Sequence, residues 1–267
     1  MSPTTNKSLA VVTGASSGIG FELAKEFARH GFDLLVIAEN SEIQPAAEQI
    51  RMLGANVKTI QQDLARYEGV EEACRQIQED GRPVDALALN AGVGAGGDFV
   101  RETTLEKDLN VIDLNVRSTV HMAKRLLPDM VRRGSGRVLF TSSIAATMPG
   151  TLNSVYNASK AFIQSFAQAI RKELENSGVT VTALMPGPTE TDFFRRADME
   201  DTKVGRSEKD DPADVAHEGF EALMAGKDHV IAGSFKNTVQ ATVAHVLPDT
   251  VLADLHEKQG RREPQTH

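Results

Sequence analysis

Three residues in the second half of the chain have side chains that could move a proton together. Tyr156 follows Ser143 by 13 positions, and Lys160 follows Tyr156 by 4. A phenol can donate or accept a proton, a nearby ammonium favours the ionised phenol, and a hydroxyl can hold a reacting oxygen. The set suits the interconversion of an alcohol and a carbonyl compound, in which a proton moves beside a hydride.

Tyr156 and Lys160 are expected to be neighbours on one helix. Residues 155–170 carry an apolar stripe at helical spacing, and the two polar residues lie together on its flank. At about 5 Å and an effective dielectric constant near 20, the ammonium favours phenolate by roughly 3 kcal/mol, or about two pKa units. With the added positive charge of an oxidised nicotinamide, the pKa of Tyr156 is predicted to lie near neutrality. The alternative is an ordinary helix surface, with Ser143 as a loop or cap residue.

A glycine-rich turn lies far upstream, between an apolar run and a helical pattern. Residues 13–20 read TGASSGIG and follow the run at residues 9–13. A diphosphate needs backbone N–H groups with no Cβ in the way, and a helix N-terminus adds partial positive charge. A glycine pattern can also be a plain turn, but its place after the first strand favours a dinucleotide site. The predicted contacts are Gly14, Ser16, Ser17, Gly18, Ile19 and Gly20.

Residues after the next strands extend this predicted site. Glu39 should lie near the adenine ribose, where a carboxylate accepts from a 2′-hydroxyl and repels a 2′-phosphate. The turn has serine at positions 16 and 17, where an arginine or lysine could bind a 2′-phosphate, so NAD is favoured over NADP. The alternative for Glu39 is an exposed acidic residue of a loop. Asp63 and Leu64 could meet the adenine.

After the fourth strand, Asn90, Ala91 and Gly92 bring small residues toward the cofactor. Asn90 has a second interpretation, which is favoured here. Its amide could brace neighbouring strands through hydrogen bonds.

Apolar runs alternate with helical segments along the whole chain. Because such runs, separated by helices, are typical of a parallel sheet buried on both faces, we predict an α/β fold. It is a doubly wound, Rossmann-type parallel sheet of seven strands with helices on both faces. The runs lie at residues 9–13, 34–38, 57–60, 84–89, 137–141, 179–184 and 229–232.

The domain prediction is one dinucleotide-binding and catalytic domain at residues 1–234, with a C-terminal helical extension at 235–267. The extension should hold two amphipathic helices around Pro248. Residues 93–99, 144–153 and 188–210 are expected to frame the substrate. The last of these resembles a lid, because Phe193, Phe194 and Met199 lie among charged residues. A surface loop with a short helix is the alternative.

Composition narrows the function further. The 267 residues carry a net charge of −8 with scattered basic pairs, which argues against a nucleic-acid partner. The single cysteine rules out an internal disulfide, and the seven histidines show no metal-binding spacing, so no metal is expected. The first residues lack a secretory pattern and no apolar run could span a bilayer, so a cytoplasmic protein is expected.

Taken together, these motifs resemble the short-chain dehydrogenase/reductase family, in its single-domain branch. The resemblance implies an NAD(P)-dependent oxidoreductase acting on CH–OH groups, with Tyr156 as general acid and base. It implies that Lys160 also holds the nicotinamide ribose and that Asn115 holds a water in a proton relay. The matching positions are Thr13 to Gly20, Asn90-Ala91-Gly92, Asn115, Ser143, Tyr156, Lys160 and Pro186-Gly187, and Thr189 and Thr191 would then touch the nicotinamide end.

The substrate and the assembly are less well defined by the sequence. An apolar lining would suit a hydrophobic ketone or secondary alcohol. Many family members end soon after the seventh strand with a segment used in tetramer packing, whereas this chain continues. A homodimer or homotetramer is expected, with the dimer favoured, and a tail bound to a membrane or hydrophobic partner is the alternative.

A redox sensor or scaffold that binds the dinucleotide without turnover is the alternative function, and a nucleotide-sugar epimerase or dehydratase fits less well.

Overall fold

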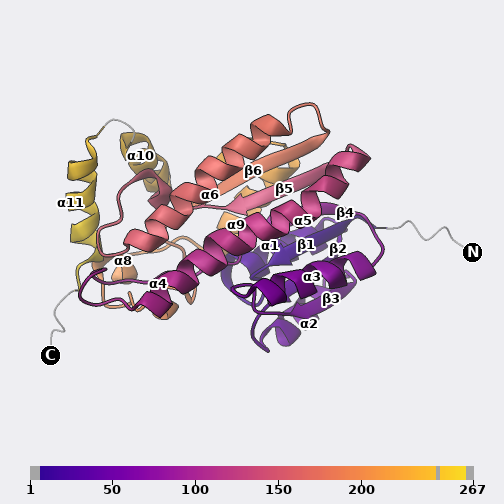
Figure 1. The fold of residues 1–267 in the computed structure, drawn as a ribbon, viewed down its shortest axis with the longest axis horizontal. Helices are drawn as coiled ribbons and strands as arrows, with labels where there is room; N and C mark the ends of the chain where they lie inside the picture. The colour runs from indigo at the N-terminus through magenta and orange to yellow at the C-terminus, as the bar shows by residue number, and fades with distance from the viewer. Residues whose placement is uncertain (1–6, 245–246, 263–267) are drawn as a thin grey trace, which may run out of the picture.

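The computed structural model describes residues 7–244 and 247–262 (Figure 1). Seven parallel strands form one sheet in the order β3-β2-β1-β4-β5-β6-β7. This order reverses direction between β1 and β4, so the doubly wound fold predicted from the sequence is confirmed. The strands are β1 (Leu9–Thr13), β2 (Asp33–Ala38), β3 (Val57–Gln61), β4 (Val84–Leu89), β5 (Gly136–Thr141), β6 (Val179–Pro186) and β7 (His229–Ala232).

Helices cover both faces of the sheet. Successive residues of a strand point to opposite faces, so each strand contributes side chains to both helix-covered layers. In β1, Leu9 and Val11 belong to one apolar cluster, and Ala10 and Val12 belong to the other. The first cluster includes residues of α3 (Tyr67–Glu79), α5 (Ser118–Arg133) and α6 (Ser154–Glu173). The second includes residues of α1 (Gly18–Arg29), α2 (Ile43–Arg51) and α9 (Pro212–Met224). Figure 1 shows the two layers on either side of the strands.

Local sequence explains where several of these helices begin and end. Pro212 occupies the first turn of α9, and the carboxylate of Asp211 accepts a hydrogen bond from the Ala213 N–H at 2.7 Å. Gly31, which follows α1, has a φ of +82°, a left-handed conformation that favours glycine. Between α4 (Leu105–Val111) and α5 the chain forms the π-helical segment η1 (Ile112–Arg117).

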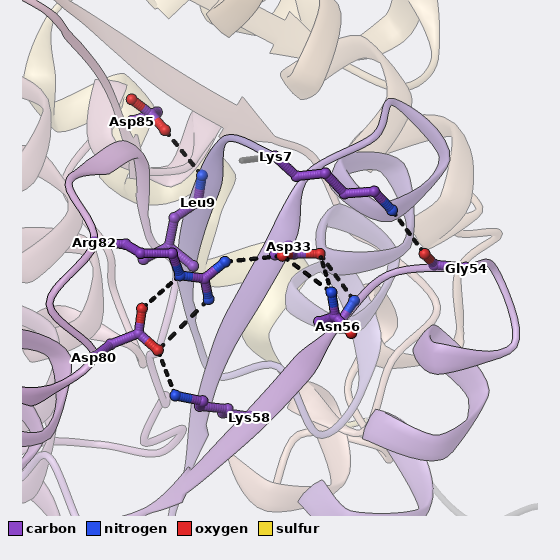
Figure 2. A network of polar contacts seen from close by, with 9 residues as sticks. All are labelled: Lys7, Leu9, Asp33, Gly54, Asn56, Lys58, Asp80, Arg82 and Asp85. Atoms are coloured by element: carbon purple, nitrogen blue, oxygen red, sulfur yellow. Dashed lines mark hydrogen bonds and ion pairs between the residues drawn. The ribbon is translucent and has the colours of Figure 1, made fainter. Parts of the chain in front are cut away.

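A polar network ties the strands together at the amino ends of β1 and β2 (Figure 2). The carboxylate of Asp33 accepts from Arg82 at 2.8 Å and from the backbone N–H of Asn56 at 3.0 Å. Asp80 pairs with Arg82 at 2.7 Å and with Lys58 at 2.6 Å. Burial pushes the pKa of Asp33 upward, but hydrogen bonds from Asn56 and Arg82 outweigh it and hold the pKa below its ordinary value. The network therefore anchors the sheet at the amino ends of its strands, opposite the carboxyl ends.

Beyond β7 the chain forms two more helices, α10 (Phe235–Ala244) and α11 (Asp249–Gly260), and Pro248 directly precedes α11. α10 packs against β7 and α11 against α8 (Lys203–Arg206), and both lie at the opposite end of the molecule in Figure 1 from α2 and β3. Two helices around Pro248 match the sequence expectation. Within residues 7–244 and 247–262, no helix has the length and apolar character needed to cross a membrane.

Candidate active site

A cleft of about 240 Å³ opens at the carboxyl ends of the strands. Most of the site residues predicted from the sequence line it, as expected where parallel strands end at one edge of a sheet. Gly20 and Asn115 do not line it and lie behind its wall. The predicted residues at the wall are Gly14, Ser16, Ser17, Gly18, Ile19, Glu39, Asp63, Leu64, Asn90, Ala91, Gly92, Ser143, Tyr156, Lys160, Pro186, Gly187, Thr189 and Thr191.

The glycine turn after β1 is a cradle that a Cβ would fill. Gly14 and Gly18 have φ angles of +67° and +57°, which side-chain-bearing residues rarely adopt. A Cβ on Gly18 would lie 2.9 Å from Cγ2 of Thr191, and one on Gly14 would lie 2.9 Å from Cα of Ala91. A Cβ on Gly20 would lie 2.2 Å from the carbonyl oxygen of Gly14. The packing therefore requires glycine at these positions, and Gly14 and Gly18 line the cleft without a side chain, which fits a dinucleotide diphosphate.

The amino end of α1 faces the same cleft. Ser17 has an extended backbone there, and its side chain makes no capping hydrogen bond. The first N–H groups of a helix carry partial positive charge, so this end suits an anion. Nη2 of Arg196 lies 3.5 Å from Oγ of Ser17, and Arg196 also lines the cleft. A cation thus reaches the turn from α7 (Phe193–Arg196), which the local sequence around Ser17 did not indicate.

Asn90 makes the bracing contacts that the sequence favoured. Its N–H donates to Oγ1 of Thr13 at 2.9 Å, and its side-chain amide donates to the Thr13 carbonyl at 3.3 Å. Its side-chain oxygen accepts from Oγ1 of Thr141 at 3.1 Å. One side chain therefore links the ends of β1, β4 and β5, while its neighbours Ala91 and Gly92 line the cleft.

Asn115 is buried in η1 and fixes two elements to each other. Its amide nitrogen donates to the Val93 carbonyl and to Oγ of Ser159, both at 2.9 Å. Its amide oxygen accepts from the Val93 N–H at 2.9 Å. The side chain therefore ties the loop after β4 to α6, at the residue next to Lys160.

Tyr156 and Lys160 extend from α6 toward the cleft. Nζ of Lys160 lies 5.7 Å from the centre of the Tyr156 ring and donates to the Thr141 carbonyl at 2.9 Å. The Tyr156 ring packs against Phe193, with ring centres 5.0 Å apart. Lys160 is buried and Tyr156 is half-buried, so their interaction takes place with little water between them.

Burial dominates the titration of this pair. It raises the pKa of Tyr156 to about 12, against a hydrogen bond with Ser143 that lowers it, and burial lowers the pKa of Lys160 to about 8. The protein's own groups therefore raise the pKa of Tyr156, and the near-neutral pKa, which was predicted with an oxidised nicotinamide bound, stays a prediction. The sequence argument counted the attraction of the ammonium and left out the cost of removing a phenolate from water.

Ser143 follows β5 and lies at the start of the short helix η2 (Ile144–Thr147). Its hydroxyl oxygen accepts from the Ala145 N–H at 3.1 Å, and its O–H donates to the Pro186 carbonyl at 3.2 Å. Ser143 therefore caps η2 and also lines the cleft, so its position fits both the cap role and the substrate-binding role considered from the sequence.

The outer part of the cleft includes residues that the sequence analysis missed. Gln240 of α10 and His256 and Gln259 of α11 line it, although no segment of the extension was assigned to the substrate. No local pattern marks these positions, because they reach the cleft only through the packing of the extension. Residues 144–153 and 188–210, which were assigned to the substrate, contribute Met148, Asn153, Phe193, Phe194, Met199 and Val204.

A family model described as short chain dehydrogenase matches residues 8–202. The chain belongs to the short-chain dehydrogenase/reductase family. Oxidoreductase UcpA of Salmonella typhimurium is 31% identical over 217 residues, which cover 80% of this chain and 79% of that protein. The resemblance seen in the sequence motifs is thereby confirmed, and this short-chain dehydrogenase/reductase is an NAD(P)-dependent oxidoreductase.

Solved structures show the same fold. A short-chain dehydrogenase from Sphingobium yanoikuyae, in complex with NADPH, superposes with a TM-score of 0.78 at 30% identity and covers 84% of this chain and 87% of its own. A ketone-specific alcohol dehydrogenase from Comamonas testosteroni has a TM-score of 0.76 at 24% identity, covering 91% and 93% of the two chains. The second likeness, at this identity, concerns the fold alone.

Proposed function

We propose that this short-chain dehydrogenase/reductase interconverts secondary alcohols and ketones, with Tyr156 as general acid and base. The observation that carries the proposal is the meeting of Ser143, Tyr156 and Lys160 at one cleft with the glycine cradle. Residues 1–234 would form the binding and catalytic domain, residues 188–210 its lid and residues 235–267 a helical extension.

The nicotinamide cofactor supplies or accepts the hydride. The glycine turn and the amino end of α1 would hold its diphosphate, because Gly14 and Gly18 line the cleft and no side chain caps the first N–H groups of the helix. Lys160 has N–H groups beyond the one given to Thr141 and would bind the nicotinamide ribose. The other proposed binding residues are Glu39, Asp63, Leu64, Asn90, Ala91, Gly92, Tyr156, Pro186, Gly187, Thr189 and Thr191.

Protons would move at the phenol of Tyr156. In reduction its O–H donates to the nascent alkoxide, and in oxidation the phenolate accepts the hydroxyl proton. Ser143 would hold the reacting oxygen, and the Lys160 ammonium, 5.7 Å from the ring, would favour the ionised phenol against the opposing effect of burial. Asn115 would keep Lys160 and the loop after β4 in register, and the relay water implied for it stays a prediction.

For the cofactor, we propose a preference for NAD(H) over NADP(H). Glu39 lines the cleft after β2, where its carboxylate would accept from a ribose hydroxyl and repel a phosphate. Arg196 lies at Ser17 and would bind the diphosphate that both cofactors share. The relative from Sphingobium yanoikuyae was solved with NADPH, so a direct comparison is needed.

Dissociation constants for NADH and NADPH test this assignment. The parent should bind NADH more tightly, Glu39→Gln should narrow the difference, and Arg196→Ala should weaken both cofactors alike. Tighter binding of NADPH by the parent would contradict the role of Glu39. If Arg196→Ala weakened the binding of NADPH alone, Arg196 would be assigned to the 2′-phosphate on the ribose instead of the diphosphate.

The substrate is proposed to be a hydrophobic ketone or secondary alcohol. Much of the outer cleft is apolar, with Ile144, Met148, Phe193, Met199 and Val204 at its wall. A panel of carbonyl compounds and alcohols, followed by the absorbance of reduced nicotinamide, tests the activity. Tight binding of NADH without turnover of any panel member would favour the redox sensor instead.

Self-association is proposed as a homodimer. Leu105, Leu109 and Ile112 recur at helical spacing on α4 and η1 with 68%, 47% and 42% exposure, and Phe162 of the adjoining α6 is 42% exposed. A second copy of the chain would cover this face, because its helices could pair about a two-fold axis. Light scattering should give a dimer for the parent and a monomer for Leu109→Asp. A monomeric parent would contradict the proposal.

A further inference from the structure

The C-terminal extension is joined to two of the three segments that are expected to frame the substrate, residues 144–153 and 188–210. Oγ1 of Thr151 donates to the Ala253 carbonyl of α11 at 3.0 Å. The N–H of Lys203, in α8, donates to the Arg261 carbonyl at 3.2 Å. Leu252 of α11 is 3% exposed, so the helix is anchored by apolar burial as well. The described part of the extension is therefore a packed wall of the cleft.

His256 is held in one orientation within this wall. Its Nδ1 lies 2.9 Å from the Thr151 carbonyl, which can only accept, so Nδ1 carries the proton. Its Nε2 lies 3.1 Å from the side-chain nitrogen of Asn157, which donates to it. Asn157 directly follows Tyr156 on α6. The neutral imidazole therefore connects the extension to the helix that carries the proton donor.

The C-terminal extension and the amino end of α6 contribute polar side chains to the cleft. Gln240, His256 and Gln259 line it from the extension, and Asn153 lines it from the amino end of α6. Asn153 is 5% exposed, and its side-chain oxygen has no hydrogen-bond partner among the described residues. A buried amide without a partner is costly in a site that serves only hydrocarbon. Its presence in a cleft that two glutamines also line points to a ligand group that forms hydrogen bonds.

We propose that Asn153, Gln240 and Gln259 form a polar subsite for a second, uncharged polar group of the substrate, with His256 as a wall residue whose two ring nitrogens are both bonded within the protein. The proposal rests on the function proposed above and specifies its substrate class as a ketone or alcohol that bears an additional hydroxyl on an apolar body. A hydroxyl both donates and accepts, as do the amides of Asn153 and the glutamines. None of the three subsite side chains is charged, and His256 in the same wall is neutral, so a neutral group matches the subsite better than a carboxylate.

Matched ketones that differ by a methyl or a hydroxyl test the subsite. 4-Hydroxycyclohexanone is compared with 4-methylcyclohexanone, and 6-hydroxy-1-tetralone with 6-methyl-1-tetralone. The readout is the ratio of kcat/KM within each pair, because this ratio does not depend on the amount of active enzyme. The parent should favour the hydroxyl compound by about tenfold in at least one pair, since an apolar substituent would leave the amides unpaired.

Gln259→Leu should bring that ratio to one or below, and the matched control Lys258→Leu should keep the parent's ratio. Lys258 is the preceding residue of α11 and is exposed to solvent. Equal turnover of both members of every pair, with a ratio unaffected by Gln259→Leu, would overturn the subsite and leave the proposed function intact.

A binding measurement separates the two proposals when turnover fails. The midpoint of thermal unfolding is measured with NAD⁺ and each compound of a pair. Greater stabilisation by the hydroxyl compound, lost in Gln259→Leu, would support the subsite even without turnover, although the proposed function would then fail. Absence of both turnover and stabilisation with the hydroxyl compounds would overturn the subsite.

Discussion

The replacement Lys160→Met tests how the protein ionises its proton donor. The variant keeps a long side chain and removes the ammonium that lies 5.7 Å from the Tyr156 ring. At an effective dielectric constant near 20, a charge at this distance is worth about 3 kcal/mol, or about two pKa units. Burial already raises the pKa of Tyr156 to about 12, so without the cation the phenol should be still harder to ionise.

The assay is the pH dependence of kcat/KM for oxidation of a secondary alcohol, which reports ionisations of the free enzyme. Activity should rise with pH as Tyr156 ionises, and below a pH of about 8 Lys160→Met should be about a hundredfold less active than the parent, with the difference narrowing at higher pH. The lysine contributes while it is charged, below its own pKa of about 8. Lys172→Met, an exposed lysine of the same helix, should leave the profile in place.

Measuring the dissociation constant of NADH in parallel separates two roles for Lys160. A pH profile of unchanged shape combined with weaker NADH binding would refute the electrostatic reasoning. Lys160 would then serve the cofactor alone.

Three further predictions concern the frame of the site. Gly20→Ala places a Cβ 2.2 Å from the Gly14 carbonyl oxygen and should weaken NADH binding by at least about tenfold, measured by fluorescence titration. Asp33→Asn weakens the pairing with Arg82 and should cost about 1–3 kcal/mol in urea unfolding. That loss should shrink as the pH falls below 3.8, because the carboxylate of the unfolded chain is protonated first, and it should vanish once the native carboxylate, whose pKa is lower, is protonated as well. Burial lowers the pKa of His256, so the parent should lose stability as the pH falls below the ordinary value of 6.5. His256→Gln should flatten this part of the melting-temperature profile, and an identical profile would contradict the buried neutral state.

The fold could be predicted because local and global signals agree in this chain. Four of the five residues that β1 buries are apolar, with Thr13 as the polar exception, and the glycines after the strand permit the turn into α1. Once the strands are parallel, residues such as Ser143 and Asn90 that follow them must meet at one edge of the sheet. The convergence of the motif residues on one cleft followed from this geometry.

The remaining features depend on contacts between distant parts of the chain. His256 reaches Asn157 across 99 positions, and Arg196 reaches Ser17 across 179, so no local pattern could pair them. The pKa of Tyr156 depends on burial by the surrounding structure, which residue spacing does not reveal. The extension was recognised as two helices, but its place at the cleft follows from tertiary packing.

The proposed acid–base role of Tyr156 is tested most directly by the single-turnover rate of ketone reduction in Tyr156→Phe. The variant removes one oxygen atom and keeps the ring that packs against Phe193. We expect the rate to fall by about 10³-fold while NADH still binds, because a positioned proton donor contributes on this scale. A variant that reduces the same ketone as fast as the parent would contradict the role assigned to Tyr156.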